Sequence, residues 1–191
     1  PDDAPGKHQS PTRIYNAMIN PVINYAIRGA IWYQGESNGG EGDSYFFKKK
    51  ALIEGWRQKW GYEFPFYFVQ LANFRKSPDN PAGGDGWAKL REAQRRTLTL
   101  PKTGMAVITD VGTPNNIHPP DKQDVGYRLA VWALNKEYGK TDVVHSGPLY
   151  KEMKVQSNQI VISFEAGTTG SGLMVGTKGT DAKKFLEPVK E

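Results

Sequence analysis

Three short apolar runs alternate along this chain with segments of helical periodicity, and no other feature restricts the possible folds as strongly. The apolar runs occupy residues 26–34, 64–71 and 105–110. Apolar side chains recur at helical spacing at about 12–25, where Pro21 should introduce a kink, and at 44–60, 87–97 and 123–138. Strands that are apolar throughout are buried on both faces, as in parallel sheets covered by helices. The sequence therefore predicts the α/β class, with a three-layer α/β/α sandwich around a parallel sheet.

The character of the sequence changes after Gly147-Pro148. Residues 155–164 alternate like a single strand, Gly and Thr residues follow, and no helical pattern returns. We therefore predict that residues 1–146 belong to the α/β domain and that residues 147–191 begin a β-rich appendage. One or two hairpins make a poor core, so the chain is expected to stop inside this appendage. The chain starts at Pro1 rather than at a methionine, and we expect that the true N-terminus and any export signal have been lost.

Composition narrows the possible partners. The 191 residues include no cysteine, which excludes a disulfide framework, a thiolate zinc site and a cysteine nucleophile. The formal net charge is +5, but Lys and Arg are interleaved with Asp and Glu, so no nucleic-acid partner is predicted. The one tight cationic run, Lys48-Lys49-Lys50, is expected to be a solvated helix face. No apolar run approaches the length of a membrane span, so no membrane insertion is predicted.

Polar side chains follow two of the predicted strands, at the sheet edge where parallel sheets place functional residues. The loop after Gln34 contains Glu36 and Asn38, although a polar turn without function has the same composition. The loop after Asp110 contains His118, which is a candidate general base because this loop leaves the same edge of the sheet. A lone histidine can also be structural or merely exposed. The other two histidines, at positions 8 and 145, are expected to be incidental.

Other chemistries fit the sequence less well. Three scattered histidines give no metal-ligand spacing, and the glycines form no phosphate-binding loop. Residues 35–39 match the G-x-S-x-G elbow of α/β-hydrolases, and the order Ser37, Asp110, His118 fits that fold. That elbow needs a helix directly after the serine, whereas residues 39–42, Gly-Gly-Glu-Gly, intervene here. We interpret the match as accidental.

Several longer strings resemble one family. They are YNAMINPVINYAIRGAIWYQGESN at 15–38, FPFYFVQLANF at 64–74, WAKLREAQ at 87–94, IHPPDKQDVGYRLA at 117–130 and SGPLY at 146–150. In this order they resemble the sialate 9-O-acetylesterases, carbohydrate esterases of the SGNH-hydrolase superfamily. The resemblance implies a flavodoxin-like three-layer sandwich, often with attached β-rich domains. It also implies removal of acetyl esters from sugars without a metal or cofactor, in a bacterial protein that is periplasmic or secreted.

The resemblance also assigns roles. His118 matches the family's general base, which later acts as the acid, and Gln34 matches an oxyanion-hole donor. Glu36 would orient the histidine, and Asn38 would add a second amide. The family's nucleophilic serine lies in a Gly-Gln-Ser-Asn-like segment near the first strand, and this chain contains no such segment. We therefore expect the sheet to be incomplete at its N-terminal side. The expected partner is the missing segment of the same protein that carries the serine, and this chain alone is expected to be inactive.

One departure from the family leaves alternatives open. Relatives often carry an aspartate two or three residues before the histidine, where this chain has Asn115 and Asn116. An asparagine cannot stabilise an imidazolium as a carboxylate does, so either Glu36 takes that role, which we favour, or the site is weakened. The predicted function is a carbohydrate O-acetylesterase acting on sialic acid. The alternatives are an acetylxylan or other plant-glycan esterase, and a carbohydrate-binding module without catalysis.

Overall fold

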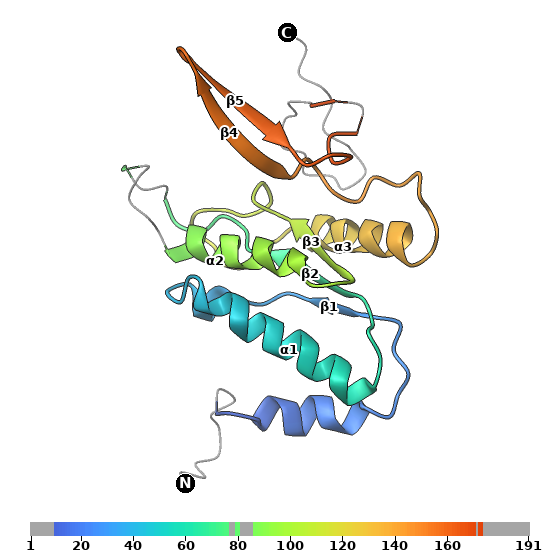
Figure 1. The fold of residues 1–191 in the computed structure, drawn as a ribbon. Coiled ribbons are helices and arrows are strands. Elements are labelled where there is room, and N and C mark those ends of the chain that lie inside the picture. The colour runs from blue at the N-terminus through green and yellow to red at the C-terminus, as the bar shows by residue number, and fades with distance from the viewer. Residues whose placement is uncertain (1–9, 77–78, 81–85, 171, 174–191) are drawn as a thin grey trace.

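A three-stranded parallel sheet in the order β1-β2-β3 forms the centre of the molecule (Figure 1). The structure, a computed structural model, describes residues 10–76, 79–80, 86–170 and 172–173. The strands are β1 (Ala30–Trp32), β2 (Phe66–Gln70) and β3 (Thr103–Val107). Ala30 lies opposite Phe66, which in turn lies opposite Thr103. The parallel sheet is therefore confirmed, although each strand is shorter than its apolar run because flanking apolar residues pack without joining the ladder.

Helices cover both faces of this sheet. The helices are α1 (Ser44–Trp60), α2 (Gly86–Arg96) and α3 (Lys122–Lys136). Phe66 and Phe68 pack with Ile53 of α1 on one face, whereas Tyr67 packs with Trp132 of α3 on the other. Neighbouring residues of a strand point to opposite faces, so the fully apolar β2 supplies two separate cores. The predicted three-layer α/β/α sandwich is confirmed.

Helix α1 fastens the start of the sheet. It ends where expected, because Gly61 adopts the left-handed conformation, at a φ of 78°, and its N–H donates to the Arg57 carbonyl. The guanidinium of Arg57 is buried and donates to the carbonyls of Phe64 at 3.0 Å and Pro101 at 2.8 Å. These carbonyls lie just before β2 and β3. Arg57 therefore joins the amino ends of two strands to one helix.

The prediction that the lysine run is a solvated face is wrong for Lys49. The buried stripe of α1 repeats every four residues, at Tyr45, Lys49, Ile53 and Arg57. Lys49 is 3% exposed, and its Nζ lies 3.3 Å from the centre of the Phe68 ring. No described residue forms a hydrogen bond with this Nζ. Burial lowers the pKa of Lys49 to about 6.

The N-terminal helical segment leaves apolar side chains on the surface. In place of one long helix there is a π-helical stretch, Tyr15–Ile19, and a 3-10 turn, Asn20–Val22. Pro21 lacks the N–H that a continuing helix would need. The apolar residues of this region with the largest exposed fractions are Ile14 at 50%, Met18 at 67%, Tyr25 at 70% and Ile31 of β1 at 71%.

The C-terminal elements form a separate antiparallel hairpin, β4 (Tyr150–Gln156) and β5 (Gln159–Phe164). The prediction of a single strand at 155–164 is wrong, because a tight turn at Ser157, with a φ of 57°, interrupts the alternating pattern. Every residue of β4 is exposed. The proposed boundary at residue 147 and the β-rich appendage remain predictions. Among the described residues, no helix is both long and apolar enough to cross a bilayer.

Candidate active site at the carboxyl edge of the sheet

The side chain of Gln34 is held by hydrogen bonds to two residues. Its Nε2 donates to Asn38 Oδ1 at 2.6 Å, and its Oε1 accepts from the Tyr45 hydroxyl at 3.0 Å. The same hydroxyl lies 2.9 Å from the Gln34 carbonyl oxygen, which also receives a hydrogen bond from Gln94. Burial raises the pKa of Tyr45 to about 12, so its hydroxyl keeps its proton at neutral pH. These contacts orient the amide, and its second N–H is not used by any described residue.

Glycine allows the backbone to turn away from β1 at this point. Gly35 is buried with a φ of 148°, and a Cβ there would lie 3.2 Å from Gln94 Nε2 and 3.3 Å from Leu90 Cδ2. A 3-10 turn, Glu36–Asn38, follows. Helix α1 begins only at Ser44, six residues beyond that turn's end, and Ser37 is exposed. This geometry agrees with the interpretation of the G-x-S-x-G match as accidental.

The loop after β3 carries His118 and is more open. Asp110 is bound to Arg128 by two hydrogen bonds of 2.6 and 2.7 Å. His118 is exposed, and its backbone N–H donates to Asn116 Oδ1 at 2.9 Å. Asn116 therefore braces the loop backbone and does not take the place of the missing aspartate at the imidazole. Downstream, Asp121 caps α3 by accepting from the Asp124 N–H.

The structure brings only some of the predicted site residues into contact. Gln34 and Asn38 are hydrogen-bonded to each other. Glu36 lines an open pocket, and no hydrogen bond or ion pair joins it to His118. No hydrogen bond or ion pair joins His118 to Asp110 either. The assignment of Glu36 as the acid that orients His118 thus stays a prediction.

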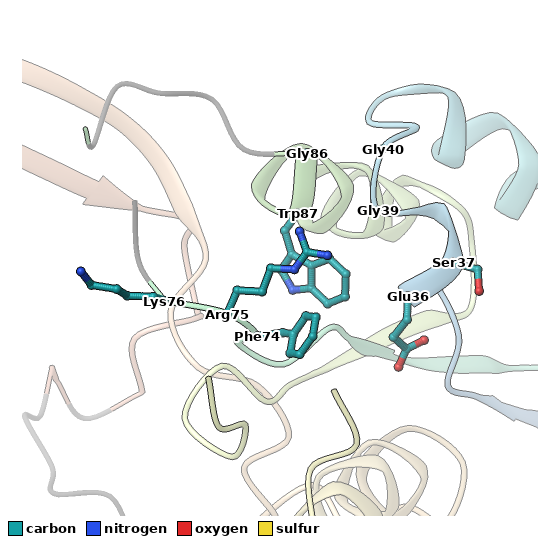
Figure 2. Close-up of a pocket in the computed structure, with 9 residues that line it drawn as sticks. All are labelled: Glu36, Ser37, Gly39, Gly40, Phe74, Arg75, Lys76, Gly86 and Trp87. Atoms are coloured by element: carbon teal, nitrogen blue, oxygen red, sulfur yellow. The ribbon is translucent and has the colours of Figure 1, made fainter. Parts of the chain in front are cut away.

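Sequence reasoning missed the residues that complete this pocket. The pocket has a volume of about 540 Å³ and lies between the loops after β1 and β2 and the start of α2 (Figure 2). The side chains that face Glu36 and Ser37 across it come from Phe74, Arg75 and Trp87. The loop after β2 also leaves the carboxyl edge of the sheet, but its residue types suggested no particular chemistry. No group of three or more His, Cys, Asp or Glu residues that could hold a metal occurs in the described part of the chain.

Comparison with known proteins now decides the family. Residues 5–134 match the carbohydrate esterases described as sialic acid-specific acetylesterases. The chain belongs to this family. It is 37% identical to a sialate O-acetylesterase of Mus musculus over 178 residues, covering 81% of this chain and 32% of that protein. It is 35% identical to the sialate O-acetylesterase of Homo sapiens, covering 84% of this chain and 33% of that protein.

A solved structure supports the same grouping. A carbohydrate acetylesterase from Xanthomonas citri superposes with a TM-score of 0.73 at 41% identity, covering 85% of this chain and 39% of that one. The chain spans about a third of the length of the mouse and human relatives. The α/β region with Gln34 and His118 lies within the matched range.

Proposed function

We propose that this chain supplies the oxyanion donors and the histidine of an O-acetylesterase that removes acetyl groups from sugars, with acetylated sialic acid as its substrate. The observation that carries the proposal is the fixed amide of Gln34, which has one N–H that no described residue uses, at the carboxyl edge of the sheet. An oriented donor of this kind stabilises the oxyanion of acyl transfer, because no reorganisation is needed when the charge develops. The family match supports the same reaction.

In the proposed mechanism, His118 takes the proton of a serine hydroxyl while the serine oxygen bonds to the acetyl carbonyl carbon. Gln34 and Asn38 stabilise the resulting oxyanion. The bond to the sugar oxygen then breaks, and the imidazolium returns its proton to that oxygen. A water molecule, deprotonated in turn by His118, then attacks the acetyl carbon. The bond to the serine oxygen breaks, this oxygen takes the proton back from the imidazolium, and acetate leaves. Glu36 balances the positive charge on His118 in both steps.

We propose that the serine comes from a further segment of the same protein that pairs with the free edge of β1. In the described sheet β1 pairs only with β2. Its central residue, Ile31, is 71% exposed, and the helical segment just before it exposes Ile14 and Met18. An apolar strand edge of this kind favours pairing with another strand. This chain covers only 32% of the mouse relative and 39% of the Xanthomonas citri esterase, so both contain further sequence in which such a segment could lie.

The test is acetate release by the full parent protein. O-acetylated sialic acid and acetylated xylan are tested in parallel as substrates, with a His118→Asn variant as the inactive control. Faster release from the sialic acid ester supports the proposal, and faster release from xylan favours the plant-glycan alternative. If the folded protein releases acetate from neither substrate yet binds the sugar, the non-catalytic alternative is correct. A periplasmic or secreted location is also proposed, and cell fractionation checks it.

A further inference from the structure

Two aromatic rings form a rigid wall of the pocket beside Glu36. The ring centres of Phe74 and Trp87 lie 5.8 Å apart. Trp87 Nε1 donates to the Ala72 carbonyl at 2.8 Å, and a Cβ on Gly39 would lie 3.1 Å from the indole. The indole is therefore held in place before any ligand arrives. Flat aromatic faces of this kind suit the C–H face of a pyranose ring, which is apolar while its hydroxyls point outward.

A cation that pairs with no carboxylate of the described residues lies in the same pocket. Arg75 has a φ of 68°, a left-handed conformation that is unfavourable for a residue with a side chain. Its backbone N–H donates to the Pro114 carbonyl at 2.9 Å, which holds this conformation. The guanidinium lies 5.5 Å from the centre of the Phe74 ring. No carboxylate of the described residues pairs with it.

Other cations near the site are engaged or point elsewhere. Arg91 donates to the carbonyls of Leu71 and Ala72, and Arg128 binds Asp110. Lys76 also borders the pocket, but Figure 2 shows it directed away from Phe74 and Trp87, and its Nζ lies 3.8 Å from Asp79. Arg75 is thus the cation that a ligand in this pocket would meet. Its planar fork of donors matches the two oxygens of a carboxylate.

We propose that this pocket is the subsite for a carboxylated pyranose, whose ring packs on Phe74 and Trp87 and whose carboxylate binds Arg75. The inference rests on the proposed acetylesterase function and assigns the recognition of the sugar to residues outside the reacting centre. Glu36 borders the pocket opposite Arg75 and repels the carboxylate of the sugar. The sugar therefore binds with its carboxylate toward Arg75 and its other end toward the loop of Gln34. Sialic acids and uronic acids share this chemistry.

The first experiment measures binding without catalysis. Calorimetric titration of the full parent protein uses N-acetylneuraminic acid without O-acetyl groups, glucuronic acid, and the methyl ester of each. We expect the free acid of one sugar to bind roughly ten- to a hundredfold more tightly than its ester, as for a hydrogen-bonded charge. Which sugar shows this preference decides between sialic acids and uronic acids as the ligand. Arg75→Gln should remove this preference. Arg95→Gln, which removes an exposed arginine paired with Glu92 on α2, should keep it.

Equal binding of acid and ester, or a preference that survives Arg75→Gln, would overturn the inference while leaving the acetylesterase proposal intact. A folded protein that keeps the Arg75-dependent preference but releases no acetate would overturn the proposed function and not the subsite. Trp87 is tested separately. Trp87→Ala should weaken acid and ester by the same factor, and Trp87→Phe should restore most of the affinity. Unchanged binding in Trp87→Ala would show that the ring does not pack on the aromatic wall.

Discussion

The loops after β1 and β3 leave the same edge of one sheet, yet they are held in different ways. Gln34 is fixed by hydrogen bonds to Asn38 and Tyr45, and Gly35 is buried beneath them. His118 is exposed, and the carboxylate that follows β3, Asp110, is bound to Arg128. The comparison indicates that the loop after β1, which we propose as the oxyanion-donor side of the site, is preorganised within this chain. The histidine side gains its contacts from the serine and substrate that the proposed reaction supplies.

The largest effect should come from the less constrained loop. His118→Ala in the parent protein removes the proposed base, and we expect kcat/KM for acetate release to fall about 10³-fold. Because the side chain is exposed, the circular dichroism spectrum and the Tm should not change. A loss smaller than tenfold in a folded variant would show that another group is the base.

The next effect tests which acid serves this loop. Glu36→Gln should lower kcat about 10²-fold with little change in KM, because the lost charge matters most when the imidazolium forms. Asp110→Asn is the matched control. This substitution weakens the pair with Arg128, so it should lower the Tm while leaving kcat nearly unchanged. If the two variants show the reverse pattern, Asp110 is the acid.

The third prediction weakens the well-held loop. Tyr45→Phe removes the hydroxyl that orients the Gln34 amide, and we expect kcat to fall about tenfold, the value of one hydrogen bond. KM should stay within a factor of two. Tyr62→Phe is the control, since its hydroxyl donates to the Ile27 carbonyl far from Gln34. Equal losses in both variants would mean that Tyr45 acts only through stability.

A fourth prediction concerns stability beneath the same loop. The Lys49 Nζ lies 5.8 Å from the centre of the Tyr45 ring, and burial lowers the pKa of Lys49 from 10.5 to about 6. Between these pH values the unfolded chain binds one more proton than the folded chain. The free energy of unfolding should therefore rise with pH, by at most about 1.4 kcal/mol per pH unit from this group.

Lys49→Met should remove this contribution and raise the free energy of unfolding more at pH 7 than at pH 9. Urea unfolding followed by tryptophan fluorescence measures it, and the exposed Lys48→Met serves as the control. An equal gain at both pH values would show that Lys49 is charged in the folded protein.

The smallest effect is expected at Ser37. Ser37→Ala should change acetate release by less than about twofold, since Ser37 borders the pocket but its hydroxyl is directed away from Phe74 and Trp87 (Figure 2). Complete loss of activity, with labelling of Ser37 by a serine-directed phosphonate, would instead make this loop a nucleophile elbow.

The sequence alone predicted the layers of the fold well, because apolar runs and helical spacing are local signals. It also grouped Gln34 and Asn38, which are only four residues apart and hydrogen-bond within one turn. It failed at Lys49, where a charged residue type concealed a position in the buried stripe of α1. It also gave no sign of the wall formed by Phe74 and Trp87. That wall depends on how the loop after β2 meets the start of α2, and such tertiary contacts leave no periodic pattern.

Arg57 has a consequence for the site although it lies at the opposite end of the sheet. Its guanidinium binds the carbonyls of both Phe64 and Pro101, so the starts of β2 and β3 are fixed relative to each other. Each residue advances a strand by about 3.3 Å. A slip of one residue between these strands would shift their far ends by more than a hydrogen bond tolerates. Arg57 therefore helps to fix the register between β2 and β3, and with it the relative positions of the loops that follow these two strands.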